Sequence, residues 1–203
     1  MKTKLLFLCI WAIFLSVLNV QAAPIFSEYF EGDLSAWTGK DQGAHFGQIV
    51  VDPLDSNNHV LNFFALNSGG DIFTKGDTFS AGTYWLSFDY LGLGETDDSG
   101  GYFGVSQAFA GVNRWFWATG TVSGAEDVLI DDGAWHSYLF ELTYDHDFHL
   151  MLEEFKRSDS IIGNAYFDNI VLSAVPEPAT MLLFGAGLLG LAGLGRKKIS
   201  KKV

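Results

Sequence analysis

Two tryptophans near the middle of the chain have the spacing of a sugar-binding platform. Trp115 and Trp117 flank a single phenylalanine, and residues two apart on a strand share one face of a sheet. Paired indole rings can stack on the apolar faces of sugar rings, while Asn113 beside them can bond the sugar hydroxyls. Tyr102 and Trp85 are weaker candidates for the same role. The alternative is that this face belongs to the core, where large aromatic residues more often lie.

The sequence contains no recognisable catalytic motif. Its five histidines form neither a His-x-Glu-x-His nor a His-Glu-x-x-His pattern, which argues against a zinc site. Glu153 and Glu154 are neighbours on a predicted strand, so they point to opposite faces and are not an acid/base pair. There is no Gly-x-Ser-x-Gly elbow, no P-loop and no Rossmann glycine motif. These absences favour a non-enzymatic protein, with a secreted glycan hydrolase or lyase as the alternative.

The elements that position these side chains are predicted to be strands. Residues Tyr84–Leu91 alternate with period two, as expected for a strand with one buried face. Similar short runs occur at Phe46–Val51, Val60–Ala65, Tyr102–Phe109, Trp135–Thr143, Phe148–Phe155 and Ala165–Leu172. Turn-forming clusters of Gly, Asp, Asn and Pro separate them, and no amphipathic helix lies between Pro24 and Pro178. The pattern predicts an all-β fold, a β-sandwich over residues 23–174.

Three short motifs give this predicted sandwich recognisable ends. It opens with Tyr29–Trp37 and closes with Ala165–Leu172, and Asp132–Tyr138 lies between them. In this order the motifs resemble those of the galactose-binding-like jelly roll shared by many carbohydrate-binding modules. The resemblance covers Ser27–Ser173. It implies a jelly-roll fold, and it informs the fold more than the activity.

The same resemblance implies a calcium site. In jelly rolls of this kind the first and last strands lie side by side, and a Glu after the opening aromatic residue shares a Ca²⁺ ion with an Asp of the closing strand. Glu31 and Asp168 occupy those places in this sequence, and calcium binds six to eight hard oxygen ligands. The alternative is that Glu31 is a solvated loop residue and Asp168 caps a turn. Further candidate ligands are Asp33, Asp52 and Asp55.

The C-terminal segment 175–203 has three parts with different physical roles. Pro176, Glu177 and Pro178 form an extended break, because proline disfavours helix in the residue before it. The 17 uncharged residues 179–195 would reach about 25 Å as a helix, close to the thickness of the hydrocarbon core. The basic end should then stay on the cytoplasmic side. That end consists of Arg196, Lys197, Lys198, Lys201 and Lys202.

This order of parts resembles the PEP-CTERM sorting signal of Gram-negative bacteria. The resemblance implies that an exosortase, a membrane-embedded cysteine transpeptidase, recognises Pro176, Glu177 and Pro178. Cleavage there would release or re-anchor the upstream domain outside the cell. Composition alone predicts only a C-terminal membrane anchor, and the resemblance implies that this anchor lies in the inner membrane. The alternative is a buried hairpin helix.

The N-terminus has the features of a secretory signal peptide. Two lysines precede the apolar run Leu5–Val20, and small residues follow it, which predicts cleavage after Ala22 or Ala23 and a signal peptide over residues 1–22. The alternative is an uncleaved anchor. The only cysteine, Cys9, lies inside this segment, so the exported part has no thiol for a disulfide or a metal.

Charge narrows the set of partners. Only five of the 12 Lys and Arg residues lie between Ala23 and Pro178, against all 24 Asp and Glu residues, which leaves that part with a formal charge of −19. Such a domain repels nucleic acid phosphates and anionic lipids. It suits a secreted protein that meets cations or neutral polymers, although solubility alone also explains the charge.

These features together predict an exported surface or extracellular-matrix protein. Its body would be a non-enzymatic β-sandwich that binds exopolysaccharide, and its partners would be exosortase, the inner membrane and a polysaccharide, with no nucleic acid. Two alternatives remain. One is the secreted hydrolase or lyase, and the other is a purely structural surface protein held together by acidic groups and calcium.

Overall fold

The computed structural model describes most of the chain between residues 23 and 175. The described ranges are 23–65, 71–76, 79–93, 100–109, 114–118, 127–155 and 163–175, with residues 185, 187 and 188. The chain divides into a unit of residues Pro24–Ala174, here called the sandwich unit, and a second unit of Met1–Ala23 and Val175–Val203. Within the described part of the chain, no helix is long and apolar enough to cross a membrane. The predicted signal peptide and almost all of the predicted anchor helix lie outside the described residues.

The described part of the sandwich unit consists of twelve strands and one short 3₁₀ helix, η2 (Lys40–Gln42). The strands are β1 (Pro24–Glu28), β2 (Trp37–Thr38), β3 (Gly47–Val51), β4 (His59–Phe63), β5 (Ile72–Thr74), β6 (Gly82–Gly92), β7 (Gly100–Ser106), β8 (Arg114–Ala118), β9 (Asp127–Val128), β10 (Trp135–Tyr144), β11 (His149–Phe155) and β12 (Ala165–Ala174).

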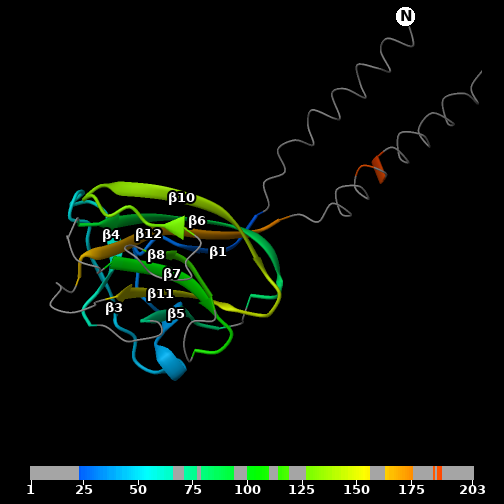
Figure 1. The fold of residues 1–203 in the computed structure, drawn as a ribbon, viewed down its shortest axis with the longest axis horizontal. Helices are drawn as coiled ribbons and strands as arrows, with labels where there is room; N and C mark the ends of the chain where they lie inside the picture. Colours follow the sequence, from blue (N-terminus) through cyan, green and yellow to red (C-terminus); the bar gives the residue numbers. More distant parts are fainter. Residues whose placement is uncertain are drawn as a thin grey trace, which may run out of the picture. The chain divides into compact units, whose positions relative to one another are not determined.

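The strands form two sheets that lie in separate layers. Sheet A has the order β10-β6-β12-β4-β3, with β1 paired to β12, and sheet B has the order β2-β5-β11-β7-β8-β9. All pairings between named strands are antiparallel except that of β8 with β9. Figure 1 shows β10, β6 and β12 in one layer and β7, β11 and β5 in the other. The predicted all-β sandwich is therefore confirmed.

The core lies between the two sheets and is rich in aromatic rings. In β6, Tyr84, Leu86, Phe88 and Tyr90 are buried, while the residues between them up to Asp89 face outward or are half-buried. This is the period-two alternation that the sequence predicts. Rings from both sheets meet in the core. The ring of Phe88 stacks on that of Phe103 in sheet B, with a centroid distance of 4.6 Å.

The two ends of the sandwich unit are joined by strand pairing. β1 runs antiparallel to β12, with Ser27 opposite Val171 and Glu28 opposite Ile170. The first and last strands therefore lie side by side, as the resemblance to jelly-roll modules implies. This pairing brings the segment that follows β1 close to the middle of β12.

Candidate functional site

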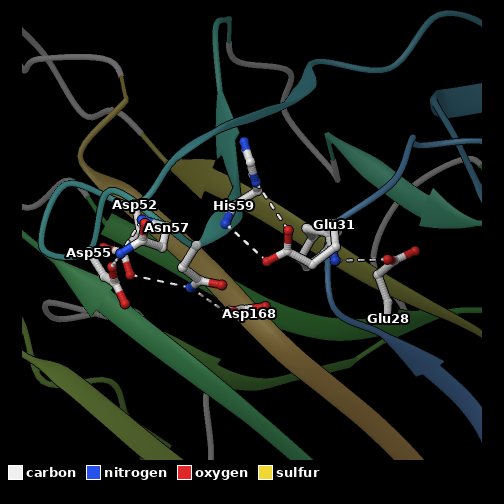
Figure 2. Close-up of polar contacts among 9 residues, drawn as sticks. Glu28, Glu31, Asp52, Asp55, Asn57, His59 and Asp168 are labelled. Carbon is white, nitrogen blue, oxygen red and sulfur yellow. Dashed lines mark hydrogen bonds and ion pairs between the residues drawn. The ribbon is translucent and has the colours of Figure 1, made fainter.

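One of the two predicted calcium ligands, Asp168, lies in a network of hydrogen bonds at the middle of β12 (Figure 2). Asp168 is buried, with an exposed fraction of 3%. Its Oδ2 accepts a hydrogen bond of 3.0 Å from Nδ2 of Asn58, and its Oδ1 accepts one of 2.7 Å from the backbone amide of Asn169. Nδ2 of Asn58 also donates to Oδ2 of Asp52 at 3.3 Å. One amide group therefore bridges two acidic side chains from distant parts of the chain.

A β-bulge places Asp168 in this network. The register between β12 and β6 shifts between Asp168 and Val171, and Asn169 within the shift has a φ of 53°. Asparagine adopts this left-handed conformation more readily than most residues. Its Nδ2 donates to Oδ2 of Asp89 on the neighbouring strand at 2.7 Å. The Asp168-Asn169 pair in the closing motif is thus explained by local backbone geometry.

Glu31 is held at its place by the turn that follows β1. The carboxylate of Glu28 accepts hydrogen bonds from the backbone amides of Tyr29 and Phe30 at 3.0 and 2.9 Å. It also accepts one from the indole N–H of Trp37 at 3.0 Å. Phe30 has a φ of 52° and is fully buried. This turn packs the ring of Phe30 into the core and leaves Glu31 at the surface.

The carboxylate of Glu31 binds the first residue of β4. Its Oε1 accepts a hydrogen bond of 3.2 Å from the backbone amide of His59, and its Oε2 lies 3.1 Å from the ring nitrogen Nδ1 of His59. These hydrogen bonds lower the pKa of Glu31. The contact joins the opening turn to β4, which lies beside β12 in sheet A.

The pKa of Asp168 depends chiefly on its burial and only to a small degree on the charge of Glu31. Burial raises the pKa of Asp168, the hydrogen bonds from Asn58 and Asn169 lower it, and the charges of Asp89 and Glu31 raise it further. Both predicted ligands already accept hydrogen bonds. No group of three or more His, Cys, Asp or Glu side chains that could hold a metal occurs among the described residues. Calcium binding by Glu31 and Asp168 therefore stays a prediction.

Asp52 links the same network to the edge of sheet A. It is 5% exposed, and its two oxygens accept the indole N–H of Trp135 at 3.2 and 3.0 Å. Its Oδ1 also accepts the backbone amide of Leu54 at 2.8 Å. The sequence indicated Asp52 only as a further metal candidate. The roles of Asn58 and His59 were missed, because the sequence marks Asn58 as a turn residue and does not reveal its distant partners.

The predicted sugar platform is only partly described by the structure. Asn113 lies outside the described residues. The backbone of β8 pairs Trp117 with Phe103 and Trp115 with Gly104, and the register shifts between the two pairs. The structure does not describe the side chains of β8, so the shared face of Trp115 and Trp117 stays a prediction.

Tyr102 is placed in the interior and Trp85 at the surface. Tyr102 has an exposed fraction of 2%, so in this conformation it offers a ligand almost no surface. Trp85 is 41% exposed and projects from the outer face of β6. Of the two weaker candidates, Trp85 is the one that a ligand can reach directly.

The buried acidic residues of β11 do not form a catalytic pair. The carboxylate of Glu154 accepts hydrogen bonds of 2.7 to 3.2 Å from the backbone amides of Gly163, Asn164 and Ala165. Burial raises the pKa of Glu154 although these hydrogen bonds lower it. It therefore orders the start of β12. Glu153 is opposite Tyr102 in the pairing with β7, on the other face of the strand.

The sandwich formed by these elements is similar in fold to solved carbohydrate-binding modules. It is similar to the CBM22-1–GH10 modules of endo-1,4-β-D-xylanase 10B from Clostridium thermocellum, complexed with xylohexaose (TM-score 0.51, 14% identity). That match covers 77% of this chain and 29% of the other, so this chain spans less than a third of that protein. The CBM22-1 xylan-binding domain of Xyn10C from Paenibacillus barcinonensis matches with a TM-score of 0.50 and 13% identity, over 78% of this chain and 99% of the other.

The C-terminus is identified by a second finding. Residues 174–197 match the PEP-CTERM protein-sorting motif, so this chain carries that motif. The predicted recognition residues Pro176, Glu177 and Pro178 lie outside the described residues, as do the basic residues from Arg196 onward. No curated protein sequence matches the chain.

Proposed function

We propose that the sandwich unit is a polysaccharide-binding module of an exported protein. The observation that carries the proposal is the likeness of the sandwich to carbohydrate-binding modules, in a chain that ends in a PEP-CTERM sorting motif. The formal charge of −19 between Ala23 and Pro178 supports a ligand that is neutral or cationic. The sequence lacks a catalytic motif, which favours binding without cleavage.

The sorting motif implies an exported protein that exosortase processes. In the proposed route, residues 1–22 direct translocation and residues 179–195 stop it in the inner membrane. The basic residues from Arg196 to Lys202 then remain inside. Cleavage at Pro176, Glu177 and Pro178 transfers the sandwich unit to the cell surface or the medium, where it meets the extracellular polymer layer.

Incubation of the purified protein with a panel of polysaccharides tests the proposal. We expect retention on at least one insoluble or immobilised polysaccharide, with no new reducing ends released. Release of reducing ends would identify a hydrolase, and unsaturated products would identify a lyase. Neither retention nor release on any polymer of the panel would contradict the proposal and favour a structural surface protein.

Calcium binding by Glu31 and Asp168 is part of the proposal. The electrostatics of Asp168 support it, because burial, and to a lesser degree the charges of Asp89 and Glu31, raise the pKa of its carboxyl group, and a bound cation would stabilise the ionised form. Binding requires Asn58 and His59 to turn away from the carboxylates. We expect the melting temperature to rise on addition of Ca²⁺ and to fall with chelator, and Asp168→Asn to abolish the shift. Equal melting temperatures with calcium and with chelator would rule this site out.

A further inference from the structure

The outer face of sheet A exposes a tryptophan on a regular sheet surface. Trp85 lies in β6 with an exposed fraction of 41%, and Leu139 lies in the neighbouring strand β10 with 66%. The residues before and after Trp85 in β6, Tyr84 and Leu86, are buried in the core. The indole of Trp85 therefore projects away from the core and toward solvent.

Strand register fixes which side chains surround this indole. Trp85 lies opposite Glu141 of β10 on one side and opposite Ser173 of β12 on the other. In the next row along the strands, Ser87 lies between Leu139 and Val171. Side chains directly opposite each other in an antiparallel pair have Cβ atoms about 4.5–5.5 Å apart. The exposed residue Glu141 thus lies directly across from Trp85 on the neighbouring strand.

Hydroxyl groups complete the surroundings of the indole. On one side of the row of Trp85, the hydroxyls of Thr83 and Thr143 lie 3.2 Å apart across the two strands. On the other side, Ser87 is half-buried and Ser137 is exposed. We call the surface formed by Thr83, Trp85, Ser87, Leu139 and Glu141 the Trp85 face.

The charge of this surface is of one sign. The strands of sheet A contain no Lys or Arg. The carboxylate residue Glu141 belongs to the Trp85 face, and a second one, Asp89, lies in the row beyond Ser87. Of the lysines in the described part of the chain, Lys40 lies in η2 and Lys75 follows β5, outside this sheet. An anionic polymer would be repelled here, whereas a cation finds both a carboxylate and the face of an indole.

We propose that the Trp85 face binds a polysaccharide of amino sugars whose amino groups are unacetylated and cationic. The inference rests on the proposed polysaccharide binding and adds the surface and the ligand class. The indole of Trp85 stacks on the apolar face of one sugar ring. The carboxylate of Glu141 pairs with an ammonium group next to that ring, and the Ser and Thr hydroxyls bond sugar hydroxyls.

Binding of glucosamine oligosaccharides to the full chain, purified in mild detergent, tests this inference. The probes are a β-1,4-glucosamine oligomer and its fully N-acetylated counterpart, measured by titration calorimetry. We expect Trp85→Ala to weaken binding of the cationic oligomer by at least about tenfold. A tryptophan that becomes buried under its ligand often contributes much of the binding energy. Glu141→Gln should weaken the cationic oligomer and leave the weaker binding of the acetylated one unchanged. Tyr29→Ala, which removes an aromatic side chain with 50% exposure in the turn after β1, is the matched control and should bind as the wild type does.

Several outcomes would overturn the inference and separate it from the proposed function. If the wild type is retained by a polysaccharide but Trp85→Ala and Glu141→Gln bind as tightly as it does, the Trp85 face is wrong and polysaccharide binding stands. If the acetylated oligomer binds as tightly as the cationic one, the ligand class is wrong. If no polysaccharide is retained at all, both proposals fail. Thermal melting checks that each variant is folded. If Trp85→Ala does not fold, the variant Glu141→Gln, at an exposed position, tests the inference instead.

Discussion

Asn58 is the residue through which two buried carboxylates share one hydrogen-bond donor group. Its side-chain amide donates to Asp52 and to Asp168, 110 positions away in the sequence. Asp52 in turn accepts the indole of Trp135. The loop between β3 and β4 is thereby joined to both β12 and β10, so a single amide contributes to the position of three segments.

Substitution of this amide should destabilise the sandwich unit. Asn58→Ala leaves buried carboxylate oxygens without one of their donors, which costs about 1–3 kcal/mol of unfolding free energy. The neighbouring Asn57 bonds only the exposed Asp55 in the same turn, so Asn57→Ala should change the unfolding free energy by less than about 0.5 kcal/mol. Urea unfolding of both variants measures the difference. Equal stabilities would show that the Asn58 network contributes nothing to the fold.

Glu154 should give the unfolding free energy a dependence on pH. Because burial raises its pKa in the folded state, its contribution to stability is complete below its usual pKa of 4.5 and is lost as the pH rises through the raised pKa. Glu154→Gln does not titrate and should lack this part of the decline. We therefore expect the stability of the wild type relative to Glu154→Gln to be greatest in acid and to diminish toward neutral pH. Unfolding curves over that range test this, and a constant or growing difference would contradict the assignment.

At the scale of elements, the two sheets are held together by aromatic rings from facing strands. Phe88 of β6 stacks on Phe103 of β7 and also on Tyr138 of β10, at a centroid distance of 5.3 Å from the latter. It is 1% exposed, and its strand lies in the interior of sheet A. The contact between layers thus depends on residues whose alternation is visible in the sequence.

Removal of the Phe88 ring should lower the unfolding free energy far more than removal of an exposed ring. Phe88→Ala removes a buried ring and should cost about 3–5 kcal/mol of unfolding free energy. Phe64→Ala is the matched control, because Phe64 is 54% exposed and its loss should cost less than about 0.5 kcal/mol. Thermal or urea unfolding gives both values. A small effect at Phe88 would mean that the two sheets do not pack through this ring.

The longer strands could be predicted from the sequence, whereas the short ones could not. The predicted run Trp135–Thr143 corresponds to β10, and Ala165–Leu172 to most of β12, because each has enough residues to show alternation. β2 and β9 have two residues each, which is too few for a periodic signal. Their strand conformation is set by pairing with neighbours in sheet B, and pairing partners are not visible in one sequence.

The candidate site was harder to predict than the fold because alternation does not tell which face meets solvent. In β7 every residue is buried, so the outward-facing Tyr102 is covered as well. In β6 the outward face is open, and Trp85, a weaker candidate from sequence, is exposed. The register shift in β8 likewise could not be foreseen, because it depends on the pairing with β7.

At the scale of the whole molecule, the sorting motif should control where the protein ends up. Glu177 is the charged residue of the predicted recognition sequence, and it lies in the matched segment 174–197. In a host that has exosortase, Glu177→Ala should leave full-length protein in the inner membrane. Fractionation and immunoblotting measure this, with Glu141→Ala as a control for loss of one carboxylate elsewhere. Mature Glu177→Ala protein in the medium at the normal size and rate would contradict the role assigned to the motif.

The proposed function depends on both the export of the protein and the fold of the sandwich unit. In the proposed function the sandwich unit can bind an extracellular polymer only if it leaves the cell, and the PEP-CTERM motif implies export. The strongly acidic sandwich unit would then select neutral or cationic polymers over anionic ones. The proposed function thus combines export, which the C-terminal motif implies, with a ligand class that the negative charge of the sandwich unit favours.

The association of the exported protein with its native exopolysaccharide tests this account most directly. Culture medium from a host that processes the protein is passed over a size-exclusion column before and after enzymatic degradation of the polysaccharide. We predict that the protein first elutes with the polymer and, after degradation, at its own size. Elution at its own size in both runs would contradict polysaccharide binding as the function of the sandwich unit.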